Sequence, residues 1–223
     1  MLDADDGLYV VVADAPLSEY GEAAIARGLA NLEWVSRAAM AHERVVESFG
    51  KADAVLPMKL FTIFTSDARV LAHVSEQRKR IETLVRRVTG HDEWSIRVVL
   101  DRARAEQAAT KSRVSSDGRT GVAYLAQKKA RRDAAKELAE RAQETVADLY
   151  DRVSATARDA KRRTASELPA QGGSLLLDAA FLIPRSRTAS FKTLVSREAK
   201  AMARHGYGVT VTGPWPPYSF VQD

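Results

Sequence analysis

Hydrophobic positions in the first half of the chain recur with the spacing of alternating strands and helices. The run "GLYVVVADAP" is apolar and ends at Pro16, which predicts a short buried strand. From Ser18 to Phe49 the apolar positions follow the helical period, and Gly28 is a candidate point of division into two helices. The next run, "AVLPMKLFTIFTS", is apolar on both faces of an extended chain and predicts a central strand.

The same alternation continues to residue 100. Asp67 is expected to cap a helix that runs to about Thr89 and stops at Gly90. The segment "DEWSIRVVL" then alternates between apolar and polar residues, which predicts a half-buried strand. The first hundred residues therefore predict the order βαβαβ. The apolar face of the last strand consists of Trp94, Ile96, Val98 and Leu100.

The second half of the chain begins with a polar stretch. Residues 101–120 predict a frayed helix that passes into a flexible linker. A long helical pattern follows from Gly121 to about Ser166, as one arm or as a helical hairpin. "SLLLDAAFLIP" predicts a strand, "SRTASFKTLVSREAKAMARHG" a helix and "YGVTVTG" a second strand. Such a unit normally has parallel strands and a right-handed crossover.

These elements predict an α+β fold of two domains, each a small sheet covered by helices. The N-terminal α+β domain is expected to span residues 1–105, and the flexible linker residues 106–120. The C-terminal domain, residues 121–223, is expected to contain the long helical arm, the strand–helix–strand unit and a tail rich in proline and aromatic residues.

Composition limits the chemistry that is available. The 223 residues include no cysteine, which excludes disulfides and thiol chemistry and fits a reducing compartment. The N-terminus lacks the features of a signal peptide, and no apolar stretch approaches the ~20 residues of a membrane span, so we expect no membrane partner. The four histidines are scattered, and adjacent residues of "HDE" at 91–93 point to opposite faces of a strand. We therefore expect no catalytic residues, no metal site and no cofactor.

Two basic clusters are the sharpest charge features. "QKKARR" contains Lys128, Lys129, Arg131 and Arg132, and "RDAKRR" follows at residues 158–163. On a helix either cluster is able to contact nucleic acid or an acidic protein surface. Acidic residues lie beside both, and the net charge of +5 is modest, so a solvated helix face is the simpler interpretation. We expect no nucleic-acid partner, and an α+β nucleic-acid-binding module is the alternative.

The tail "VTGPWPPYSFV" combines three prolines with three aromatic residues. The prolines suit a short polyproline II segment of the kind that docks on aromatic grooves. Because the segment directly follows a strand with buried valines, we expect it to fold back instead. In this interpretation Trp215 and Phe220 pack on the second domain and Tyr218 is partly exposed. The three aromatic side chains are also candidates for partner binding.

Several blocks of the chain, taken together, resemble the GvpL/GvpF family of gas vesicle proteins. They run in order from Pro16 to Phe220 and cover nearly the whole chain. The two strongest are "YLAQKKARRD" and "TGPWPPYSF". The others are "PLSEYGEAAI" with "NLEWV", "VLPMKLFTIF", "HDEWSIRV" and "LLLDAAFLIPR".

The resemblance implies a non-enzymatic accessory or minor structural protein of gas vesicle assembly. Its expected partners are the small hydrophobic wall protein GvpA and other Gvp accessory proteins, and its expected location is the cytoplasmic gas vesicle. The family pattern implies two α+β domains, at least one of them ferredoxin-like. It also has a further strand before the equivalent of "GLYVVV", so we expect the first sheet of this chain to lack one strand. The candidate partner-binding residues are Lys128, Lys129, Arg131, Arg132, Trp215, Tyr218 and Phe220.

Overall fold

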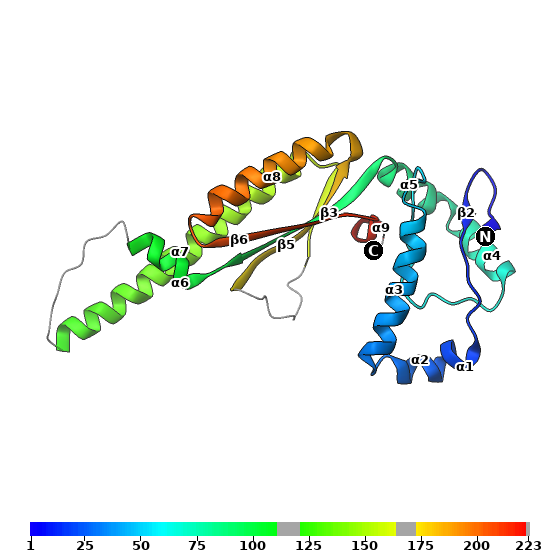
Figure 1. Ribbon diagram of the computed structural model, residues 1–223, viewed down its shortest axis with the longest axis horizontal. Helices are drawn as coiled ribbons and strands as arrows, with labels where there is room; N and C mark the ends of the chain where they lie inside the picture. The colour runs from blue at the N-terminus through cyan, green and yellow to red at the C-terminus, as the bar shows by residue number, and fades with distance from the viewer. Residues whose placement is uncertain (111–120, 164–172, 222–223) are drawn as a thin grey trace. The chain divides into compact units, whose positions relative to one another are not determined.

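The computed structural model describes residues 1–110, 121–163 and 173–221 and divides the chain into two compact units (Figure 1). Unit 1 comprises Met1–Gly90 together with Pro216–Asp223, and unit 2 comprises His91–Trp215. This division differs from the predicted boundary at residue 105. The difference arises because the strand at 91–100 forms hydrogen bonds to two strands of unit 2 and to none described in unit 1.

Unit 2 contains a four-stranded antiparallel sheet in the order β4-β5-β3-β6. With the intervening helices, this order gives the βαββαβ arrangement of a ferredoxin-like domain and confirms the predicted α+β class. Strands β5 and β6 run in the same direction, but β3 lies between them. The strands are β3 (His91–Leu100), β4 (Asp159–Arg162), β5 (Ser174–Pro184) and β6 (Tyr207–Trp215).

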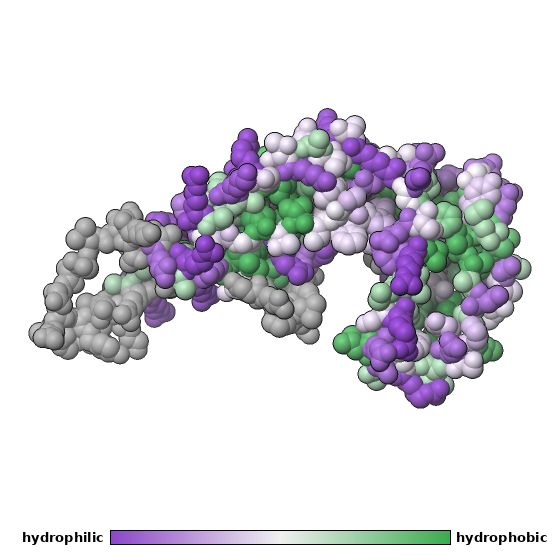
Figure 2. All heavy atoms as spheres, in the orientation of Figure 1, coloured by the Kyte–Doolittle hydropathy of each residue, from purple (hydrophilic) through white to green (hydrophobic). Residues whose placement is uncertain are grey.

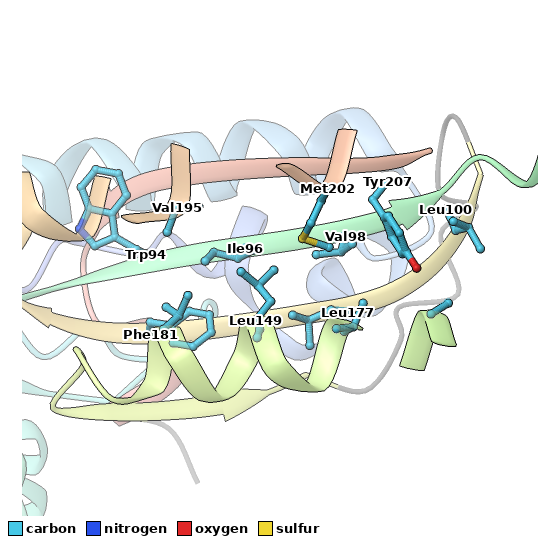
Figure 3. Packing of buried hydrophobic residues seen from close by; sticks show 14 of the residues in the cluster. Trp94, Ile96, Val98, Leu100, Leu149, Leu177, Phe181, Val195, Met202 and Tyr207 are labelled. Carbon is cyan, nitrogen blue, oxygen red and sulfur yellow. The ribbon is translucent and has the colours of Figure 1, made fainter. Parts of the chain in front are cut away.

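One face of this sheet is covered by α7 (Gly121–Ser154) and α8 (Thr188–Ala203), as Figure 3 shows from close by. Ile96 of β3, Phe181 of β5 and Leu149 of α7 meet there and have no exposed surface. The predicted apolar face of β3 is confirmed, since each of its four residues is at most 4% exposed. The remaining elements of this unit are α6 (Arg102–Thr110) and a 3-10 turn, η1 (Arg185–Arg187).

The long helix is a single element, but it ends twelve residues before the predicted Ser166, at Ser154. The predicted end of the helix is wrong because residues 159–162, within "RDAKRR", pair with β5 as the edge strand β4. Its backbone is fixed by hydrogen bonds at both ends, from Arg158 N to Leu182 O (2.8 Å) and from Arg163 N to Asp178 O (2.8 Å). Most of the predicted linker, residues 111–120, and the predicted end of the helix, residues 164–166, lie outside the described residues.

Unit 1 is largely helical, unlike the predicted βαβαβ order. The expected buried strand is reduced to Tyr9–Val10, which pairs only with Leu2–Asp3 among the described residues. Val11 and Val12 are 44% and 37% exposed, because no further described strand covers them. The elements are β1 (Leu2–Asp3), β2 (Tyr9–Val10), α1 (Leu17–Tyr20), α2 (Glu22–Gly28), α3 (Leu32–Ser48), α4 (Asp67–Glu76), α5 (Arg78–Val88) and α9 (Tyr218–Val221).

The predicted central strand over residues 54–66 is wrong. This segment is irregular, and Phe61 adopts a positive φ of 63°, which is incompatible with an extended chain. Residues 59–62 form a turn, since Thr62 N donates a hydrogen bond to Lys59 O at 3.1 Å. Apolar alternation was a misleading signal here, because a strand also needs a neighbouring strand to satisfy its backbone.

The helical expectations for unit 1 hold more closely. The stretch from Ser18 to Phe49 divides after Gly28, as predicted. The predicted helix from Asp67 to about Thr89 is present as α4 and α5, with a break at Gln77. Its cap is Ser66 rather than Asp67, because the Ser66 hydroxyl accepts a hydrogen bond from Arg69 N at 3.3 Å.

Candidate interaction surfaces

The C-terminal tail packs in unit 1, contrary to the prediction that Phe220 lies on the second domain. Phe220 is 1% exposed, and its carbonyl oxygen accepts a hydrogen bond from Arg87 Nη1 at 3.2 Å. The Arg87 guanidinium also lies 5.7 Å from the centre of the Phe220 ring. Tyr218 is half-buried, and its hydroxyl donates to Glu43 Oε2 at 2.5 Å. Both side chains are therefore used inside the fold.

Trp215 is the candidate of the tail that keeps a free surface. It ends β6 in unit 2 and is 40% exposed, so the prediction that it packs into a core is wrong. Its indole Nε1 donates to Thr212 Oγ1 at 3.2 Å, which holds the ring beside its own strand.

The basic cluster "QKKARR" lies on α7, as predicted. Lys129 and Arg132 are exposed, while the side chains of Lys128 and Arg131 lie outside the described residues. Further along the same helix, Glu137 pairs with Arg141 at 2.5 Å. This part of α7 is a solvated, charged segment, whereas the later residues Ala142, Val146, Leu149 and Val153 are buried against the sheet.

Two arginines of the second basic cluster, Arg162 and Arg163, contact other side chains of unit 2. Arg163 donates to Glu93 Oε1 at 2.7 Å and approaches Asp178 Oδ1 at 3.3 Å, and both carboxylate side chains are nearly buried. Arg97 holds the second oxygen of Asp178 at 2.8 Å. The Arg162 guanidinium stacks 4.3 Å from the centre of the Tyr150 ring. The Arg163 contacts link the residue after β4 to β3 and β5, and the Arg162 contact links β4 to α7.

Exposed apolar side chains occur at several places in unit 1, and three of them lie on α1, just after α2 and at the start of α3. Leu17, Leu29 and Leu32 are 81%, 58% and 80% exposed. We call these three residues the leucine end. Figure 2 shows hydrophobic atoms at the surface of this end among charged ones. The sequence pattern placed Leu29 and Leu32 on a helical period and did not indicate this surface, because the helical period alone does not reveal what covers a face.

An aromatic cluster joins α1, α3 and the irregular segment at residues 54–66. The Trp34 ring stacks on Phe61 with their centres 5.0 Å apart and lies 6.0 Å from the Tyr20 ring. Gly28 provides the space for this ring, since a Cβ at Gly28 would approach Trp34 to 2.5 Å. Asn31 caps the N-terminus of α3, because its side chain accepts a hydrogen bond from Trp34 N at 3.1 Å.

Catalytic or metal chemistry has no visible support in the part of the chain that the structure describes. No group of three or more His, Asp or Glu side chains there is able to hold a metal ion. None of the described helices combines the length and the apolar character that crossing a membrane requires.

Comparison with known proteins gives the chain its family. The family model described as "Gas vesicle synthesis protein GvpL/GvpF" matches residues 3–222. Gas vesicle protein L of Streptomyces sp. (strain CB03234) is 27% identical over 96% of this chain and 79% of its own length. Gas vesicle protein F of the same strain is 28% identical over 82% of this chain and 76% of its own length.

Solved structures share the fold. The crystal structure of gas vesicle protein GvpF from Anabaena sp. PCC7120 superposes with a TM-score of 0.62 at 19% identity, over 84% of this chain and 76% of that one. GvpF from Microcystis aeruginosa superposes with a TM-score of 0.61 at 17% identity, over 83% and 78% of the two chains. The match of the family model over nearly every residue shows that the chain belongs to the GvpL/GvpF family of gas vesicle proteins.

Proposed function

We propose that this chain is a non-catalytic accessory or minor structural protein of gas vesicle assembly that binds the hydrophobic wall protein GvpA. The observation that carries the proposal is the exposure of three leucines in unit 1: Leu17 on α1, Leu29 directly after α2 and Leu32 at the start of α3. Family membership supports the context of gas vesicle proteins. The proposal implies location at the gas vesicle in the cytoplasm and contact with other Gvp proteins.

Exposed leucines favour an apolar partner. Burying a leucine side chain that was exposed contributes roughly 1.5–3 kcal/mol. Single exposed leucines are common on protein surfaces, and the proposal is that one partner covers these three together. A small hydrophobic wall subunit exposes apolar surface before it is assembled, so its chemistry matches that of the leucine end.

The basic cluster of α7 has a separate part in the proposal. Lys128, Lys129, Arg131 and Arg132 are expected to affect the orientation and rate of association rather than its final strength. Two of these side chains, Lys129 and Arg132, are exposed, and so are the residues at 133–136 that follow them on the helix. Their contribution should therefore weaken as salt screens the charges.

Co-purification with tagged GvpA tests the apolar contact. The variant with Leu17, Leu29 and Leu32 all replaced by Gln is expected to lose capture, because each substitution removes the apolar surface that the partner covers. Met40→Gln and Val45→Gln together are the matched control, since both residues are exposed on α3 outside the leucine end, at 57% and 45%. Undiminished capture of the triple variant, with normal folding by circular dichroism, would refute the proposed contact.

Neutralising the four basic residues of α7 tests the charge contribution. The variant with all four replaced by Gln is expected to associate with GvpA more slowly at low salt and as fast as the wild type at high salt. Binding kinetics measured at both salt concentrations make the comparison. Equal rates at low salt would remove the basic cluster from the mechanism.

A nucleic-acid-binding module remains the alternative function for the basic helix. It predicts oligonucleotide binding that weakens steeply as salt rises. An electrophoretic shift assay at low salt decides between the two, because the proposed function predicts no shift.

A further inference from the structure

Strand β6 forms one edge of the unit 2 sheet. Among the described residues its only neighbour is β3, with Thr210 opposite Arg97 and Val209 opposite Val98. Thr210 and Thr212 are exposed, while Val209 and Val211 are half-buried against the core. One side of this nine-residue strand therefore has no backbone partner in the described chain.

The hydrogen-bond pattern identifies which residues of β6 face outward. Asp101 N donates to Gly206 O at 3.0 Å, and the next pair along the ladder joins Leu100 to Tyr207. Antiparallel pairs alternate between hydrogen-bonded and non-bonded positions. The N–H and C=O groups of Val209 and Val211 consequently point away from β3, toward the open edge.

The two edges of the sheet differ in a way that matters for association. The opposite edge, β4, has four residues and carries Asp159, Lys161 and Arg162. Short, charged edges prevent strand pairing. In β6 the run Gly208–Thr212 has no charged residue and alternates valine with threonine, two residues that favour strands. Only Pro214, near the end of the strand, interrupts the available donors.

We propose that β6 pairs with β6 of a second copy of this chain, antiparallel and about a two-fold axis at Thr210. In this register the two Thr210 residues face each other, and Val209 of each copy pairs with Val211 of the other. An uncharged strand meets its own copy without like-charge repulsion, and directly opposed threonines are a favourable cross-strand pair. The outward groups of Val209 and Val211 then form hydrogen bonds, and two four-stranded sheets become one.

Charge substitution at Thr210 tests the register. By light scattering after size exclusion, the wild type is expected to rise from 24.5 kDa toward twice that mass as concentration increases. Thr210→Lys and Thr210→Glu should each remain at the monomer mass, because like charges would lie opposite each other. An equal mixture of the two variants should recover the dimer. Thr193→Lys, an exposed position on α8, is the matched control and should dimerise like the wild type.

A single cysteine gives a second test that does not depend on dimer strength. The chain has no cysteine, so Thr210→Cys introduces one thiol per copy. The Cα atoms of a non-hydrogen-bonded pair lie about 4.5 Å apart, within the range of a disulfide. Mild oxidation with diamide should therefore link two copies through Thr210→Cys and leave Thr193→Cys unlinked.

Either of two results would overturn the proposal. One is a wild type that stays monomeric at high concentration. The other is that Thr210→Lys or Thr210→Glu dimerises by itself, without being mixed with the other variant. Loss of GvpA capture by the Thr210 variants, with a monomeric wild type, would assign the edge to a strand of the wall protein. That outcome also contradicts self-pairing. It is distinct from failure of the proposed function, which is measured at the leucine end.

Discussion

At the junction of α2 and α3, the absence of a side chain at Gly28 allows an aromatic ring to pack. The Trp34 ring lies where a Cβ of residue 28 would be, and it stacks on Phe61. Alanine is a better helix former than glycine by about 1 kcal/mol, so propensity alone favours substitution at this helix end. Steric conflict with the Trp34 ring disfavours the substitution, and the size of this conflict decides whether Gly28→Ala lowers or raises the stability of unit 1.

We expect Gly28→Ala to destabilise unit 1 by about 1–3 kcal/mol, the usual cost of inserting a methyl group into filled space. Urea unfolding followed by circular dichroism measures the change. In a Trp34→Leu background the same substitution should be neutral or stabilising, because the obstructing ring has been removed. A destabilisation of equal size in both backgrounds would mean that Trp34 is not the cause.

The aromatic residues of the tail predict a second contrast at this scale. Phe220→Ala should cost about 3–5 kcal/mol, as expected for a buried phenylalanine, whereas Trp215→Ala should cost less, since Trp215 is 40% exposed. Chemical denaturation of the two variants provides the comparison. An equal or larger loss in Trp215→Ala would instead support the packed tryptophan that the sequence led us to expect.

Among the elements, two strands of unit 2, β3 and β5, are linked by the side chain of one arginine. Arg163 contacts Glu93 of β3 and Asp178 of β5, whose side chains are 3% and 6% exposed. Removing Arg163, whose side chain is 36% exposed, takes a charged hydrogen-bond donor away from two nearly buried carboxylates, while Arg97 still contacts Asp178. Exposed pairs such as Arg37–Glu33, with side chains 64% and 80% exposed, contribute little.

Arg163→Ala is therefore predicted to lower stability by about 1–3 kcal/mol, because solvent partly screens its charge, and Arg37→Ala by less than about 1 kcal/mol. Thermal unfolding of both variants measures the difference. If the two losses are equal, the carboxylates of Glu93 and Asp178 are adequately stabilised without Arg163.

Local pattern predicted the elements that carry their own signal. "DEWSIRVVL" and "SLLLDAAFLIP" were recognised as strands because their apolar residues suit one or both faces of a sheet, and both are strands. "RDAKRR" was missed, since its strand depends on pairing with β5 and its arginines on carboxylates far away in sequence. The leucine end was also missed, because exposure depends on which elements meet.

For the whole molecule, unit 1 is built from both ends of the chain. Residues 1–90 are joined by the last residues after β6. Leaving proline aside, the tail contributes two of the six apolar side chains that are buried in the described part of this unit. They are Val46, Val70, Val74, Val88, Phe220 and Val221. Sequence order gave no indication of this arrangement, which is why the predicted domains were contiguous.

Deletion of residues 216–223 is expected to loosen unit 1 selectively. Amide hydrogen exchange should accelerate in α5, whose residues contact α9, while β3 and β5 of unit 2 keep their protection. Mass spectrometry of proteolytic fragments resolves the two units. Equal acceleration in both, or in neither, would contradict the assignment of the tail to unit 1.

The central claim, that the leucine end serves gas vesicle assembly, is tested most directly in cells that carry the other gas vesicle genes but lack this chain. They are supplied with the wild type, the triple variant of Leu17, Leu29 and Leu32 to Gln, or the Met40→Gln and Val45→Gln control, at equal protein levels. Buoyant vesicles are then measured by flotation and pressure-sensitive light scattering. The account predicts vesicles with the wild type and the control and few or none with the triple variant. Normal vesicle yield with the triple variant would contradict it.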